Sequence, residues 1–225
     1  MRGMAETAVP ARAQGDLQHA SPPASSRQRL LDAALHVVRA QGYAATTVDD
    51  ICAAAGVTKG SFFHHFKSKD DLALASVASW RAMTEALFAA APYHHHPDPL
   101  ARLLGYVDLR GAMLTGEIAD YTCLLGTLVQ ETYATHPTIR EACEAALSSH
   151  VAALTVDVEA AKKRYAPRAK WTAESVGTFM QSVLQGAFIF AKAKQTPEVA
   201  REAIEHLRRY IEMLFPRDAK AQKRR

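Results

Sequence analysis

The stretch that decides the fold runs from residue 46 to residue 72 and reads TTVDDICAAAGVTKGSFFHHFKSKDDL. Within it, Thr47 and Asp50 have the spacing of a capping box, which marks the first turn of a helix. Gly56 permits a tight turn after that helix, because glycine tolerates left-handed backbone conformations. Thr58 can then cap a second, short helix that runs to about Phe66. Two helices joined by a tight turn predict a helix-turn-helix.

The second helix of this pair has an apolar side and a polar side. Val57, Phe62 and Phe66 are expected to anchor it on the core. The residues left facing outward are small or polar, and they stand at the end of the helix where a recognition helix meets base edges. They are Lys59, Gly60, Ser61 and His64.

Each of these outward residue types has a use in a DNA groove. Lys59 can donate to guanine or to a phosphate, Ser61 can donate or accept at a base edge, and Gly60 lets the backbone approach closely. Phosphate oxygens are the expected partners of the neighbouring threonine hydroxyls and of a lysine beyond the second helix. These four are Thr46, Thr47, Thr58 and Lys69.

The same stretch resembles the DNA-binding domain of the TetR family of bacterial repressors. The resemblance rests on the TTVDDI start, the AGVTKGSFFHHF run, the KSKDDL end and an upstream Gln41-Gly42-Tyr43. Phe63 departs from the family pattern, which usually has a tyrosine there whose hydroxyl contacts phosphate. A phenyl ring lacks that hydroxyl, so we expect Phe63 to meet DNA through packing alone. The resemblance implies a DNA-binding repressor and not an enzyme.

The rest of the chain is organised around this segment. Residues 1–25 lack apolar periodicity and predict a disordered leader. A helical stripe begins at Ser26 and ends near Gln41, so residues 26–72 form the predicted DNA-binding domain. Residues 73–215 predict a helical effector-binding and dimerisation domain, followed by a basic tail over 216–225.

Long helices dominate the predicted second domain, and no segment shows the alternation of a strand. Prolines at positions 99, 137 and 197 fit first-turn sites. The fold class is therefore all-α with about nine helices in total. After the one that begins near Ser68 and ends near Ala90, the predicted helices cover residues 99–115, 118–135, 137–165, 172–194 and 197–215.

The charge and the cysteines constrain the class of protein. The formal net charge of +4 equals that of residues 216–225, so the folded body is neutral overall. Residues 56–69 contain three lysines and no acid, which favours contact with DNA phosphates there. Three scattered cysteines with no CxxC pair, no signal peptide and no long apolar run predict a reduced cytoplasmic protein without membrane contact.

In TetR-like proteins the body encloses a ligand pocket and the last two long helices form a dimer interface. The resemblance thus implies a small-molecule effector, a homodimer through helices 172–194 and 197–215, and a palindromic operator. Gly177 and Gly186 are candidates for close approach of the partner. Effector contacts are sought among large or polar-tipped apolar residues. The candidates are Trp80, Met83, Phe88, Tyr106, Met113, Tyr121, Cys123 and Leu128.

Cys123 has two interpretations. TCLLGTLVQE resembles a segment of a TetR subgroup that includes electrophile sensors, although Thr122 replaces the glycine usual before the cysteine. A sensor thiol needs a nearby cation to favour the thiolate, and Lys192 or Lys194 could supply it. The alternative is an inert cysteine that packs like a small hydrophobe.

Other classes of function remain open at this point. The run from His94 to His96 could suggest a metal protein or an enzyme, but consecutive histidines in a proline-rich loop converge poorly on one ion, so we predict neither metal nor cofactor. A helical adaptor that binds another protein is the third alternative. Loss of activity or of bound metal on replacing the histidines would favour the enzyme or metal protein. A DNA pull-down that recovers nothing would favour the adaptor.

Overall fold

The computed structural model describes residues 24–216, which form ten α-helices and one short 3-10 helix and contain no strand. The prediction of an all-α fold is confirmed. The predicted leader and tail lie outside the described residues, apart from residues 24, 25 and 216. In chain order the elements are α1 (Ser26–Gln41), α2 (Val48–Ala55), α3 (Lys59–His65), α4 (Lys69–Ala89), η1 (Pro92–His95), α5 (Pro99–Ala112), α6 (Ile118–Tyr121), α7 (Leu124–Thr132), α8 (Pro137–Tyr165), α9 (Ala173–Lys194) and α10 (Glu198–Leu214).

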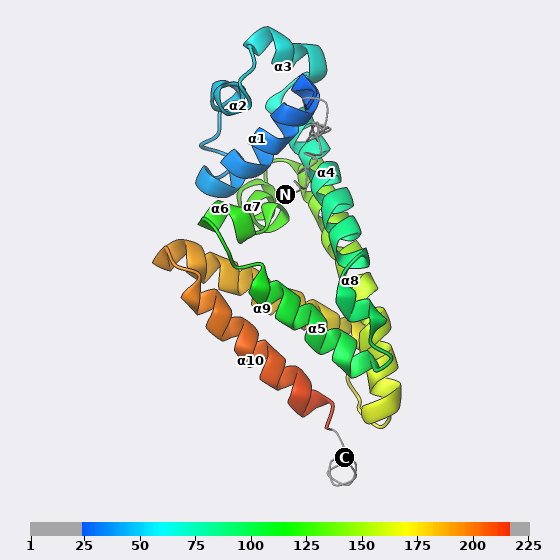
Figure 1. Ribbon diagram of the computed structural model, residues 1–225. Coiled ribbons are helices and arrows are strands. Elements are labelled where there is room, and N and C mark those ends of the chain that lie inside the picture. The colour runs from blue at the N-terminus through cyan, green and yellow to red at the C-terminus, as the bar shows by residue number, and fades with distance from the viewer. Residues whose placement is uncertain (1–23, 217–225) are drawn as a thin grey trace, which may run out of the picture.

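The first three helices form a small cluster at one end of the molecule (Figure 1). The capping box is present, since the Thr47 hydroxyl accepts from the Asp50 amide and the Asp50 carboxylate accepts from the Thr47 amide. Gly56 ends α2 in the left-handed conformation, with φ 61°. Burial of Phe62 against α1 and α2 then holds α3 in place.

Two long helices connect this cluster with the rest of the molecule. α4 leaves the cluster and runs alongside α8 toward the opposite end (Figure 1). α8 contains 29 residues, and its first turn begins at Pro137, which needs no backbone donor there. A movement at one end of such a helix is carried along its length, because the backbone hydrogen bonds keep it rigid.

The largest core lies where α5, α8, α9 and α10 meet. It includes Tyr106, Met180, Leu184 and Ile211, each at most 1% exposed. α10 packs along α5 and α9 and closes the domain (Figure 1). Pro197 precedes α10 as its N-cap residue, whereas the sequence suggested a place inside the first turn.

The prediction of one helix over residues 118–135 is wrong. The chain instead forms α6, two extended residues at Thr122 and Cys123, and then α7. Arg39 of α1 donates to the backbone carbonyls of Asp120 and Thr122, at 3.0 and 3.4 Å. An uninterrupted helix would use these carbonyls internally, so the contact with α1 requires the break.

The two glycines of α9 differ from one another. A Cβ on Gly177 would lie 3.3 Å from side-chain atoms of Val151 and Thr155 on α8, so this glycine serves packing within the chain. The expectation that it receives a partner backbone is therefore wrong. A Cβ on Gly186 would meet nothing within 4 Å, so that side of α9 is open.

Candidate DNA-binding surface and effector cavity

The outer face of α3 carries most of the predicted DNA contacts. Thr58 caps the helix through a 3.2 Å hydrogen bond from the Ser61 amide to its hydroxyl oxygen, which leaves the hydroxyl proton free for another acceptor. Lys59, Gly60 and His64 are exposed, and Ser61 is partly exposed. Phe63 is 55% exposed, beside the buried Phe62. Thr47, also exposed, stands at the start of α2.

Lys59 is paired with an acid that precedes it in the chain. Its Nζ lies 2.9 Å from the Asp49 carboxylate, and this hydrogen bond raises the pKa of Lys59. Both side chains are more than half exposed, at 57% and 69%. An exposed ion pair contributes little to stability, so the lysine can exchange the carboxylate for a phosphate at small cost.

Thr46 and Lys69 occupy other places than the sequence suggested. Thr46 is 1% exposed, and its hydroxyl donates to the Gly42 carbonyl at 2.6 Å. The Lys69 ammonium donates to the carbonyls of Tyr43 and Thr46, at 3.0 and 2.9 Å, and lies over the Tyr43 ring. The predictions that Thr46 binds phosphate through its hydroxyl and that Lys69 clamps DNA are thus corrected. Both residues fix the loop between α1 and α2.

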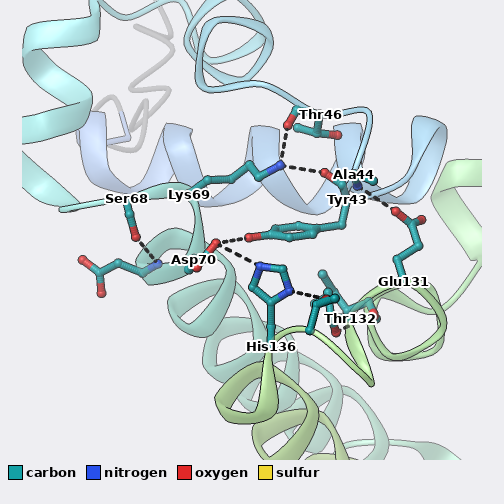
Figure 2. A network of polar contacts seen from close by, with 12 residues as sticks. Tyr43, Ala44, Thr46, Ser68, Lys69, Asp70, Glu131, Thr132 and His136 are labelled. Carbon is teal, nitrogen blue, oxygen red and sulfur yellow. Dashed lines mark hydrogen bonds and ion pairs between the residues drawn. The ribbon is translucent and has the colours of Figure 1, made fainter.

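The same loop is joined to the body by a polar network, shown in Figure 2. The Tyr43 hydroxyl hydrogen-bonds the carboxylate of Asp70 at the start of α4. The His136 ring, just before α8, lies 3.9 Å from Asp70 and packs edge-on against Tyr43. Glu131 of α7 accepts from the Ala44 amide at 2.7 Å. The network therefore ties the DNA-binding domain to both α7 and α8.

A cavity of about 250 Å³ lies in the body, with walls from α1 and from α4 through α9. Its size is below the roughly 300–1,000 Å³ of pockets that hold drug-sized ligands. Six of the eight predicted effector residues line it, and they come from α4, the C-terminal end of α5, α6 and the α6–α7 break. These are Trp80, Met83, Phe88, Met113, Tyr121 and Cys123.

Tyr106 and Leu128 do not line this cavity. Leu128 is 1% exposed in a core between the two domains, so it is packing and not a wall. Tyr106 lies one layer behind the wall, where its hydroxyl accepts from Gln181 at 2.8 Å and lies 3.0 Å from His150 Nε2. The prediction that these two residues contact an effector directly is therefore corrected.

Cys123 lies on the cavity wall with partial exposure, while Cys52 and Cys143 are buried. Two cations face its thiol closely enough to interact with it electrostatically, Arg39 and Lys192. Burial lowers the pKa of Lys192, whose Nζ donates to the Thr127 hydroxyl at 2.8 Å. Of the two lysines suggested by the sequence, Lys192 is the one placed by the thiol.

Five of the unpredicted polar residues of the cavity wall come from well-separated parts of the sequence. They stand on four different helices, so no spacing along the chain connects them. The available signal was a single arginine within an apolar helical stripe, and this pattern is present at Arg39 and Arg110. The missed residues are Arg39, Arg110, His150, Gln181 and Gln185.

The histidine run from His94 to His96 lies at the end of the short 3-10 helix η1. Between residues 24 and 216, no three His, Cys, Asp or Glu side chains are grouped so as to hold a metal ion. The His94 ring lies 3.0 Å from the Phe88 carbonyl oxygen. In the same part of the chain, no helix combines the length and the apolar character that crossing a bilayer requires.

Comparisons with known proteins agree with this geometry. One family profile, described as bacterial regulatory proteins, tetR family, matches residues 30–76, and another, described as tetracyclin repressor-like, C-terminal domain, matches residues 99–207. The transcriptional regulator AcuR of Cereibacter sphaeroides is 32% identical over 124 residues, 55% of this chain and 57% of that protein. The HTH-type transcriptional repressor KstR2 of Mycolicibacterium smegmatis is 48% identical over 52 residues, 23% of this chain and 25% of that protein.

Among solved structures, a regulatory protein TetR from Rhodobacter sphaeroides superposes with a TM-score of 0.74 at 26% identity. That match covers 82% of this chain and 98% of the other. The curated sequence matches are shorter, since the chain spans little more than half the length of AcuR. Sequence profiles and fold agree from α1 to α10, and the chain belongs to the TetR family of bacterial transcriptional regulators.

Proposed function

We propose that this protein is an effector-responsive repressor that binds a palindromic operator as a homodimer. The observation that carries the proposal is the outer face of α3. Its N-terminal turn presents Lys59, Gly60 and Ser61 outward, while Phe62 fixes the helix from behind. A rigid helix with donors at one end suits insertion into a major groove.

The proposed dimer uses the outer faces of α9 and α10. Phe179, Ile189 and Phe190 of α9 are 42%, 48% and 59% exposed, and Met213 of α10 is 73% exposed. Large apolar groups gathered on adjacent helices usually mark an interface. Gly186 leaves room on the same helix for a partner. A two-fold axis through this surface would direct two α3 helices at successive half-sites.

Arg39 supports the coupling of an effector to DNA. It belongs to α1 of the DNA-binding domain, yet it lines the cavity and its guanidinium lies over the Trp80 ring at 4.9 Å. An effector that displaces Arg39 would shift α1 relative to the body. Because such an effector would bind one arrangement better than the other, it would change the population that fits the operator.

Cys123 supports a second class of effector, a small electrophile. Its thiol lies on the cavity wall, where Arg39 and Lys192 interact with it electrostatically, so an electrophile that enters the cavity would meet it. Alkylation would place the added group against Arg39. The two effector classes would then act on the same residue of α1.

Substitution of Lys59 tests the proposed mode of DNA binding. Genomic fragments recovered with the purified protein would be titrated by fluorescence anisotropy at several salt concentrations. Lys59→Ala should weaken binding by about 1–3 kcal/mol if the lysine reads a base, or lower the salt slope by about 1 if it binds phosphate.

Lys163→Ala is the matched control, since Lys163 is an exposed lysine of α8 paired with Glu159. It should leave both the affinity and the salt slope unchanged. An operator affinity of Lys59→Ala equal to that of the wild type, with the same slope, would contradict the assignment of α3. An absence of DNA from the pull-down would contradict the repressor itself.

A further inference from the structure

We infer that the effector is a small organic carboxylate with an apolar body, and that Arg110 binds its carboxylate. This inference rests on the proposed function in one respect, namely that the 250 Å³ cavity is the effector site. Arg110 stands near the end of α5 and lines that cavity.

Arg110 has no acidic partner in the described part of the chain. Its guanidinium lies 5.5 Å from the centre of the Phe88 ring and 5.6 Å from that of Phe188, and residues 24–216 offer it no ion pair or hydrogen bond. Arginine stays charged at all physiological pH values. A partly buried guanidinium held between two phenyl rings therefore keeps its donors for an external anion.

The other charged groups of the wall are engaged with each other. Arg81 pairs with Glu85 at 2.7 Å. Arg39 donates to the carbonyls of α6 and interacts with Asp120. The wall thus holds three arginines against two carboxylates, and the unbalanced positive charge belongs to Arg110.

His150 adds no charge to this balance. Burial, together with the neighbouring Arg110, lowers the pKa of His150 to about 4. The buried Tyr106 hydroxyl accepts from Gln181 and lies 3.0 Å from His150 Nε2, so this side of the imidazole is engaged within the protein. A neutral imidazole cannot replace Arg110 as the partner of an anion.

The charge balance and the lining of the cavity define the charge of the ligand and the character of its body. One unbalanced charge fits a monoanion, whereas a phosphate dianion would require more cations. Trp80, Phe88, Tyr121 and two methionines supply the apolar lining. A bidentate guanidinium–carboxylate pair with an apolar body against these side chains satisfies both features.

Calorimetric titration of the full-length protein tests this inference with two matched pairs of probes. They are benzoate against benzamide and hexanoate against hexanamide. Because a hydrogen bond to a charged group is worth about 1.5–3 kcal/mol, each carboxylate should bind roughly ten-fold or more tightly than its amide. Arg110→Gln should reduce each ratio to about two-fold or less, and Arg110→Lys, which keeps a point charge, should retain part of it.

Arg140→Gln removes the same charge from an exposed site at the start of α8 and should keep the wild-type ratios. Thermal melting of each variant establishes that it folds. Equal affinities for carboxylate and amide in the wild type, failure of both carboxylates to bind, or unchanged ratios in Arg110→Gln would overturn the inference. Carboxylate preference in a protein that retains no DNA would overturn the repressor and leave the ligand class standing.

Discussion

At the scale of single residues, the three cysteines show how position decides reactivity. Burial raises the pKa of Cys143 to about 12, so its thiol stays protonated at neutral pH. Cys52, in the core of the DNA-binding domain, also has its pKa raised by burial. Cys123 differs from both because it borders the cavity and two cations face it. The thiol is therefore buried at two positions, and Cys123 is the one that we propose as the site of reaction.

N-Ethylmaleimide should accordingly alkylate Cys123 first, with its sulfur adding to the double bond of the reagent. The adduct should release the operator, because it occupies the space next to Arg39. Mass spectrometry would locate the adduct, and anisotropy would follow the DNA. Cys143→Ser is the control and should respond like the wild type. Release that persists in Cys123→Ser would remove the electrophile hypothesis.

At the scale of helices, the sequence could predict the features that local signals determine but not those that tertiary contacts determine. The starts of α2, α3 and α4 were predictable because Thr47, Thr58 and Ser68 cap them through bonds within three residues. The break after α6 was not, since the partner of its free carbonyls, Arg39, lies about eighty residues earlier.

The residues of the candidate site also fall into those that local signals predict and those that only tertiary contacts place. The exposed face of α3 could be predicted from helical periodicity, since the anchoring residues Phe62 and Phe66 stand four positions apart in the chain. Lys69 was misplaced because a polar residue at a helix start says nothing about which loop folds back onto it. Arg110 and His150 were missed because only the packing of α5 against α8 brings them together.

The outer face of α9 gives a prediction at this scale. Phe190→Glu places a charge where 59% of the phenylalanine is exposed, so the monomer should fold while the dimer dissociates. Sedimentation velocity would measure the change, and operator affinity should fall with it. Tyr133→Glu, at a 63% exposed aromatic beyond α7, should remain dimeric. A Phe190→Glu dimer as stable as the wild type would exclude this surface.

At the scale of the whole molecule, polar contacts join the DNA-binding domain to the body at two places, beside the apolar core that contains Leu128. One is the polar network around Tyr43, Asp70 and His136 (Figure 2), and the other is the reach of Arg39 over the cavity. The first place contributes no residue to the lining of the cavity, whereas Arg39 of the second is part of it. The proposed effector would act on the second attachment, while the first would hold the domain in place.

Arg39→Met should separate operator binding from the release of the operator by an effector. Methionine keeps the apolar stem near Trp80 but cannot donate to the carbonyls of α6. Operator binding should persist, while release by benzoate or by N-ethylmaleimide should weaken about five-fold or more, which is the usual lower range of allosteric coupling. Anisotropy at increasing effector concentration would measure it. Release at wild-type concentrations would show that the signal takes another route.

The interruption between α6 and α7 also bears on how such regulators could be recombined. The hydrogen-bond acceptors of Arg39 in this interruption are backbone carbonyls, so they are set by chain geometry, while its guanidinium also lies over the Trp80 ring and interacts with Asp120. A chimera that joins this DNA-binding domain to a foreign body should stay connected wherever that body keeps the same interruption. Grafting would then require matching this bend of the main chain together with the side chains that pack against α1, such as Trp80 and Leu128.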